Sequence, residues 1–159
     1  MSYTDLRDYI EELKRRDLLR VIDEQVCKDT ELVPLVGLQF RGLPESERQA
    51  FWFRNVTDAR GRNFDASVVL GCSRAVYAAA LGVDVDEIGA RWAQAQGNHL
   101  LPEQVEQDQA PCKEVVLTAP DLQGGVDRFP HLISTPGFDP APFITAGVWV
   151  TRDPEDGSY

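Results

Sequence analysis

The sequence lacks long apolar runs: no stretch of its 159 residues approaches the roughly 18 apolar residues that a membrane-spanning helix needs. It also lacks basic character, because 26 acidic residues outnumber 16 basic ones and the net charge is −10. Such a surface is a poor match for nucleic acid or anionic lipid, so we expect neither as a partner. The first residues are polar and resemble no signal peptide, so the cytoplasm is the expected location.

Cysteine and histidine are scarce. The three cysteines, Cys27, Cys72 and Cys112, are widely spaced and form no Cys-x-x-Cys pair. This spacing argues against a zinc knuckle or a redox dithiol and predicts reduced, structural thiols. The two histidines, His99 and His131, have no partner at metal-ligand spacing, and we interpret both as structural.

Signatures of nucleophilic catalysis and of nucleotide binding are also missing. Ser73 is not part of a Gly-x-Ser-x-Gly elbow, and a helix N-cap explains it better. Gly71 and Gly124-Gly125 lie outside any Gly-x-Gly-x-x-Gly or Gly-Lys-Ser/Thr motif, which argues against a phosphate cradle. Acidic pairs are interpreted as solvated faces, caps and turns: Glu11-Glu12, Asp84 with Asp86, and Glu155-Asp156. The residues alone therefore assemble no nucleophile, base and oxyanion site.

What the sequence does contain is typical of a globular protein, with 43% hydrophobic and 26% charged residues. Helical spacing of apolar residues predicts a helix over residues 5–16, with Thr4 as its cap. A second helix is predicted after a cap at Asp29 or Thr30, with Leu32, Leu35, Val36 and Phe40 facing the core and Gly42 as its end.

Two more helices are predicted further along the chain. One follows Ser73, contains residues 75–80 and ends at Gly82, and the other begins at Asp84 or Asp86 and continues through Ala95. Short apolar runs predict strands at residues 19–21, 51–53, 67–70, 114–118 and 143–151. The turn residues 58–63 make the second and third of these an antiparallel pair.

The pattern changes after a polar segment at residues 97–111, which we interpret as a linker. We therefore divide the chain into an α/β domain (1–98), a linker (99–111) and the beginning of a β-rich domain (112–159). The fold class expected for the whole is α+β. The last predicted strand leads into a turn at residues 152–158, after which only Tyr159 remains. This predicts that the chain is cut inside a β-hairpin and that the second domain is incomplete.

Four stretches give the sequence its resemblance to a known family. They are DLRDYIEELKRRDLLRVID (5–23), GCSRAVYAAALG (71–82), PCKEVVL (111–117) and PFITAGVWVTRDPEDG (142–157). Together they resemble the N-terminal portion of the UbiD family of prenylated-FMN-dependent decarboxylases, with Asp17 where the family often has glycine. The likeness spans nearly all of this chain, which is about the first third of a typical family member.

The resemblance implies that residues 112–159 begin a split β-barrel like that of flavin reductases. In the family this barrel holds prenylated FMN, a divalent metal (Mn or Mg) and potassium. The family's metal-binding Asn, catalytic Arg and acid pair match no position in this sequence. Thr145 is the one residue that the resemblance places near the flavin, and β-propensity explains a threonine there equally well.

Two hypotheses follow from the resemblance. In the first, the chain is part of a decarboxylase that removes CO2 from an aromatic or α,β-unsaturated carboxylic acid, with the flavin as electron sink. A flavin prenyltransferase would supply the cofactor, and the protein would be a homo-oligomer. Residues 1–159 alone are then expected to be inactive and to retain no flavin. In the second, the chain is a non-catalytic scaffold or assembly subunit built on the same domain.

Overall fold

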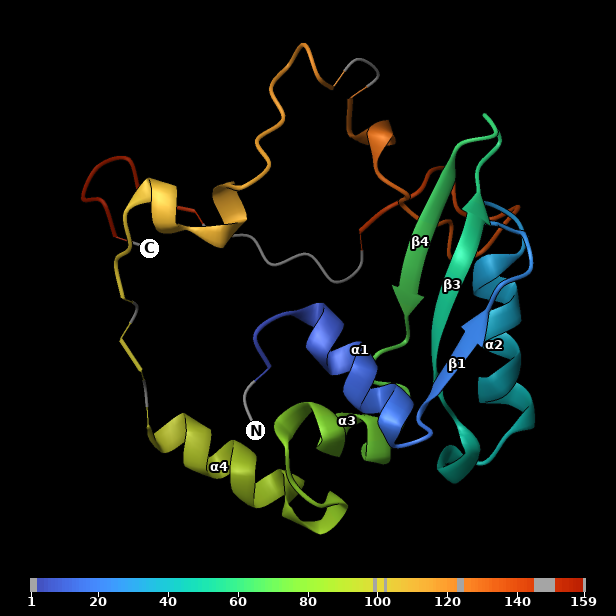
Figure 1. The fold of residues 1–159 in the computed structure, drawn as a ribbon, viewed down its shortest axis with the longest axis horizontal. Helices are drawn as coiled ribbons and strands as arrows, with labels where there is room; N and C mark the ends of the chain where they lie inside the picture. The colour runs from blue at the N-terminus through green and yellow to red at the C-terminus, as the bar shows by residue number, and fades with distance from the viewer. Residues whose placement is uncertain (1–2, 99, 102, 123–124, 145–150, 159) are drawn as a thin grey trace.

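The computed structural model describes residues 3–98, 100–101, 103–122, 125–144 and 151–158. The described residues form a four-stranded sheet with helices packed on both faces (Figure 1). The α-helices are α1 (Leu6–Arg15), α2 (Leu32–Gly42), α3 (Arg74–Leu81) and α4 (Ile88–Gly97). The strands are β1 (Leu19–Ile22), β2 (Val26–Cys27), β3 (Ala50–Thr57) and β4 (Asn63–Val68).

The sheet is mixed and is built around β3. Strands β1 and β2 both pair with β3 in parallel, β1 along its first half and β2 at its end. Strand β4 pairs with β3 in the antiparallel sense, as the sequence predicts, with an irregularity between Phe53 and Val56. This mixture of helices and strands agrees with the expected α+β class. The sheet is open, and the described residues contain no split barrel.

The first helix forms where it is predicted, but its cap is one residue later. The Asp5 carboxylate, not the Thr4 hydroxyl, accepts from the backbone N–H of Arg7 and of Asp8. Asp5 has the extended backbone of an N-cap, and its carboxylate can reach both donors. The backbone N–H of Thr4 donates instead to Asp8 Oδ2.

The second helix corrects two expectations. Neither Asp29 nor Thr30 caps α2, whose N-cap is Glu31 without a side-chain hydrogen bond. The Asp29 carboxylate pairs with Lys28 instead. Leu32 and Val36 are buried as predicted, whereas Leu35 and Phe40 are 45% and 43% exposed, because the sheet covers only one side of the helix.

The third helix follows its sequence signals closely. Ser73 is its N-cap, with the hydroxyl accepting from the Val76 N–H, and Gly82 ends it in the left-handed conformation at φ 66°. Asp84 then forms a capping box with Glu87 at the start of the turn that leads into α4. Helix α4 has no buried residue: its Trp92 is 45% exposed and packs on the ring of Tyr77.

Two hydrophobic clusters hold these elements together, one on each face of the sheet. The first joins α1 and α3 to β1 and β3 through residues such as Leu13, Leu19 and Val76. The second joins α2 to β2, β3 and β4, and its fully buried members are Leu32, Phe53 and Val56. Figure 1 shows α1 and α3 on one side of the strands and α2 on the other. Leu132, far along the chain, packs against the second cluster.

The later residues are mostly irregular. The prediction of a strand at residues 114–118 is wrong. A short 3-10 turn at Pro111–Lys113 is followed by bends, and no strand in the described part of the chain pairs with this segment. Most of the strand predicted at residues 143–151 lies outside the described residues. The turn at residues 152–158 is confirmed, with Asp153 N–H donating to Ser158 O at 2.8 Å and Gly157 N–H to Asp153 O at 3.0 Å.

Every helix in the described part of the chain is too short or too polar to cross a bilayer.

Candidate functional site

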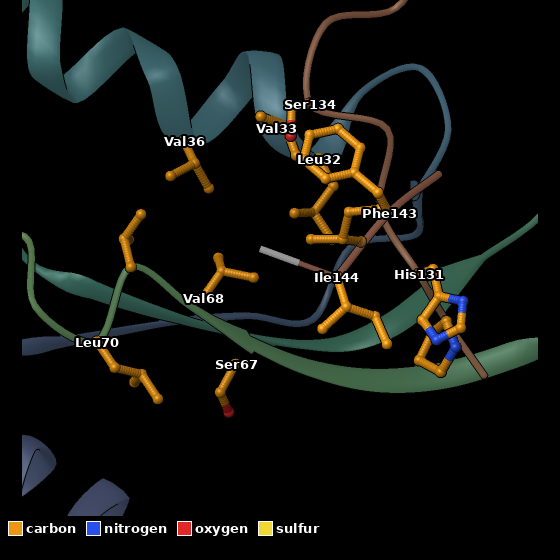
Figure 2. Close-up of a pocket in the computed structure, with 13 residues that line it drawn as sticks. Leu32, Val33, Val36, Ser67, Val68, Leu70, His131, Ser134, Phe143 and Ile144 are labelled. Carbon is orange, nitrogen blue, oxygen red and sulfur yellow. The ribbon is translucent and has the colours of Figure 1, made fainter. Parts of the chain in front are cut away.

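A cavity of about 460 Å³ lies between α2, β4 and the segment around residues 130–144 (Figure 2). Helix α2 contributes the side chains of one wall, and β4 with the residues after it contributes the opposite wall. Figure 2 shows Phe143, Ile144 and His131 gathered at one end. The lining residues are Leu32, Val33, Val36, Ser67, Val68, Val69, Leu70, Pro130, His131, Leu132, Ser134, Phe143 and Ile144.

Local sequence explains how α2 and β4 form two walls of the cavity. Leu32 and Val36 are one helical turn apart on α2, so they present to the same face of the sheet. Strand β4 ends at Val68, and the next residue, Val69, has a φ of 52°. This left-handed backbone is unusual for a β-branched residue and turns the chain away from the sheet. Leu70 can therefore line the cavity after the strand has ended.

The third wall is held in place by Lys28, which lies between β2 and α2. The Lys28 ammonium is buried, pairs with the Asp29 carboxylate and donates to the backbone carbonyl of His131 at 2.9 Å. Phe143 N–H donates to Leu132 O at 3.3 Å, which ties the two ends of this irregular segment together. The His131 ring lies 6.1 Å from the ring of Phe129, measured between centroids.

This arrangement can bind an apolar group, but it does not by itself form a cofactor site. The described lining residues include no lysine, arginine, aspartate or glutamate. The described lining therefore offers no ion pair to a flavin phosphate or to a carboxylate. Within the same described ranges, no group of three or more His, Cys, Asp or Glu side chains could hold a metal ion. The described residues therefore do not fit prenylated FMN or a divalent metal, and no chemical step is derived through either.

The residues singled out from the sequence fall into three groups. Thr145, the predicted flavin neighbour, and His99 lie outside the described residues. His131, interpreted as structural, lines the cavity. Ser73 caps α3 as predicted, and the helix N-terminus next to Gly71 is satisfied by the protein itself, because the Glu45 carboxylate accepts from the Arg74 N–H at 2.7 Å.

The acidic pairs do not all lie on solvated faces, because Glu12 of the first pair is only 9% exposed. Glu12 accepts from Arg15 at 2.8 Å and from Arg16 at 2.5 Å, and these hydrogen bonds lower its pKa to about 2. Asp156 accepts from the Ser158 N–H, which lowers its pKa and closes the turn. Neither carboxylate lines the cavity.

Two of the cysteines can be placed. Cys27 and Cys72 are free thiols in the structure, as expected from their spacing. Burial raises the pKa of Cys72, which keeps the thiol protonated and unreactive near neutral pH.

Sequence reasoning missed Lys28 and the cavity itself. The cavity joins α2 and β4 to residues near position 131, and no periodicity in the sequence connects segments so far apart. The sequence around Lys28 does not predict that its side chain is buried. A lysine beside an aspartate, here Asp29, is also a common pattern on protein surfaces.

Comparison with known proteins identifies a related fold. No family model and no curated protein matches this chain. Among solved structures, the chain is similar to vanillic acid decarboxylase of Sedimentibacter hydroxybenzoicus, described as an open form of ShVdcCD with a truncated ShVdcD. The TM-score is 0.57 and the sequence identity is 21%, over 74% of this chain and 25% of that chain. The two chains share a fold. This chain therefore spans about a quarter of the length of its structural neighbour.

Proposed function

We propose that this chain is the N-terminal part of a UbiD-like decarboxylase that removes CO2 from an aromatic or α,β-unsaturated carboxylic acid. The proposal includes prenylated FMN, a divalent metal and potassium as cofactors of the whole protein, and a flavin prenyltransferase as their supplier of flavin. Their ligands would lie outside the residues described above. The observation that carries the proposal is the fold shared with vanillic acid decarboxylase over 74% of this chain.

Contacts between two family-like stretches support the proposal. Tyr9 belongs to the stretch 5–23, and Val76 to the stretch 71–82. The Tyr9 hydroxyl lies 2.9 Å from Val76 O and 3.0 Å from Leu70 O, so its single proton serves two carbonyls. The two stretches that resemble the family are thus packed on one another in one hydrophobic cluster.

The cavity suggests how such a protein would hold its substrate. Its volume of about 460 Å³ suits a small ligand, and its walls are mainly aliphatic. In the proposal, the ring or alkenyl chain of the acid occupies this cavity. The carboxylate would then be met by cationic groups from the rest of the protein, because the described lining residues supply none.

A second candidate is an assembly role, and the surface of α2 favours it. Leu35, Leu38 and Leu43 line one groove and are 45%, 58% and 37% exposed. Exposed apolar clusters of this kind often mark protein–protein contacts. Sedimentation velocity tests this role: Leu38→Glu should dissociate an oligomer that the unmodified protein forms, and a monomeric unmodified protein would contradict it.

The decarboxylase proposal is tested with the complete product of the gene that encodes this chain. The protein should be purified from cells with and without a flavin prenyltransferase, and bound flavin identified by its visible spectrum and mass. We expect prenylated FMN only in the first preparation. Residues 1–159 alone should retain none. A folded full product that carries no flavin from either cell type would contradict the proposal.

Two substitutions test the assignment of the cavity. Ile144→Trp fills one end of it, and should raise the KM for the acid with a smaller effect on flavin content. Phe138→Trp is the matched control, since Phe138 is 86% exposed and does not line the cavity. Equal KM values for the two variants would show that the acid binds elsewhere.

A further inference from the structure

Lys28 has an environment that its sequence position does not explain. Its side chain is only 7% exposed, although lysine is rarely buried unless it is paired. Its ammonium meets the Asp29 carboxylate, which is itself 20% exposed, and the carbonyl of His131. The second contact joins residues 103 positions apart in the chain.

A buried ammonium is costly unless hydrogen bonds and a counter-charge replace its hydration. Asp29, the next residue, supplies the counter-charge. An ion pair between these two neighbours could also form at the surface, so it does not explain why Lys28 is buried. The additional contact with His131 O gives the buried ammonium a second role. It anchors an irregular segment that has no strand or helix of its own at this point. Charge-assisted hydrogen bonds of this kind are stronger than neutral ones.

The anchored segment is the third wall of the cavity. Pro130, His131 and Leu132 all line it, and Leu132 also packs against the cluster formed by α2 and the sheet. The backbone N–H of Phe143 is bound to Leu132 O, so the placement of residues 143–144 depends on the same anchor. Besides the Lys28 contact, the described part of this wall is held by the apolar packing of Leu132 and by backbone hydrogen bonds within its own segment, from His131 N–H to Phe129 O at 2.9 Å and from Phe143 N–H to Leu132 O at 3.3 Å.

From this geometry we infer that Lys28 is a positioning residue: its ammonium fastens the 130–132 segment to the first domain and so fixes the His131 side chain and the width of the cavity. Lys28 is not among the described residues that line the cavity, and it acts through the backbone carbonyl of His131. This role does not rest on the proposed function.

The test combines three variants of the full chain with two residue-resolved measurements. Lys28→Met keeps the length of the side chain and removes the charge, Lys28→Arg keeps the charge and the donors, and Lys14→Met is the matched control at an exposed lysine. The first measurement is hydrogen exchange of the amides of Phe143 and Ala50. The Ala50 N–H bonds to Leu18 O at the far end of the sheet and reports the stability of the first domain.

In Lys28→Met, the Phe143 amide should exchange about tenfold faster relative to Ala50, the effect expected for the loss of one charged hydrogen bond. Lys28→Arg should largely restore the original ratio, and Lys14→Met should leave it unchanged. Equal acceleration at Phe143 and Ala50 would overturn the inference, because Lys28 would then support the domain as a whole. An unchanged ratio would overturn it as well.

The second measurement follows the imidazole resonance of His131, with His99 as the internal reference. It should shift in Lys28→Met and return toward the original position in Lys28→Arg. If Lys28→Met fails to fold, Lys28→Gln takes its place, because it removes the charge and keeps a polar group, and its His131 resonance should shift while the Ala50 amide stays protected. A His131 resonance that is identical in every folded variant would contradict the inference.

Discussion

The hydroxyl of Tyr9 offers a sharp test of how α1 and α3 pack on the sheet. Tyr9 is 9% exposed, and its hydroxyl serves the carbonyls of Leu70 and Val76. Val76 O lies within α3, so it retains a helical partner if the hydroxyl is lost. Leu70 O lies in an irregular segment and would lose its partner in Tyr9→Phe.

The expected cost follows from that asymmetry. One carbonyl in a partly buried position loses its donor, which corresponds to a loss of about 1–2 kcal/mol in the free energy of unfolding. With a slope of about 1.5 kcal/mol per molar urea, the unfolding midpoint should fall by about 1 M. Tyr77→Phe is the matched control: Tyr77 is 41% exposed, and its midpoint should change by less than about 0.3 M. Equal midpoints for Tyr9→Phe and the unmodified chain would refute the reasoning.

The Tyr9 hydroxyl should also make the stability of the fold depend on pH. Burial raises the pKa of Tyr9 from 10.0 to about 12. Because the folded pKa lies above the unfolded value, the stabilisation is complete below pH 10 and is lost as the pH rises toward 12. Tyr9→Phe should therefore show a shallower loss of stability between these two pH values, measured by urea titration at each pH.

Two further predictions concern α1 and α3. Hydrogen bonds from Arg15 and Arg16 lower the pKa of Glu12 from 4.5 to about 2, so their stabilisation is present above pH 4.5 and is lost as the pH falls toward 2. Glu12→Gln should flatten this acid transition in a circular dichroism titration, and an unchanged transition would argue against the ion pairs. Ser73→Ala removes the cap of α3 and should cost about 1 kcal/mol in urea unfolding, whereas Ser73→Asp should not; equal losses in both would argue against capping.

Elements with strong local signals were predictable from the sequence. The helix over 74–81 combines a serine cap, a run of helix-forming alanines and a terminal glycine, and all three act within one short segment. The strand β2 was missed, because Val26 and Cys27 form too short a run to show alternation. It exists through its parallel pairing with Val56 and Thr57, which is a tertiary contact.

Burial was less predictable than secondary structure. Leu35 and Phe40 fit the apolar stripe of α2, yet the sheet is too narrow to cover the whole stripe and both remain exposed. The candidate site could not be derived from the sequence at all, since its walls meet only through the fold. Thr145, the one site residue that the resemblance supplied, follows directly after Ile144, which lines the cavity, but lies outside the described residues.

The central claim is that this chain belongs to a protein that decarboxylates an unsaturated acid. The most direct test is to incubate the complete gene product, purified with flavin prenyltransferase, with acids labelled with carbon-13 at the carboxyl group, and to measure labelled CO2 by mass spectrometry. The panel should include vanillate, 4-hydroxybenzoate and cinnamate. We predict labelled CO2 from at least one acid, with none from protein made without the prenyltransferase. A folded, flavin-loaded protein that releases no label from any acid of the panel, and exchanges no labelled bicarbonate into the products, would contradict the account.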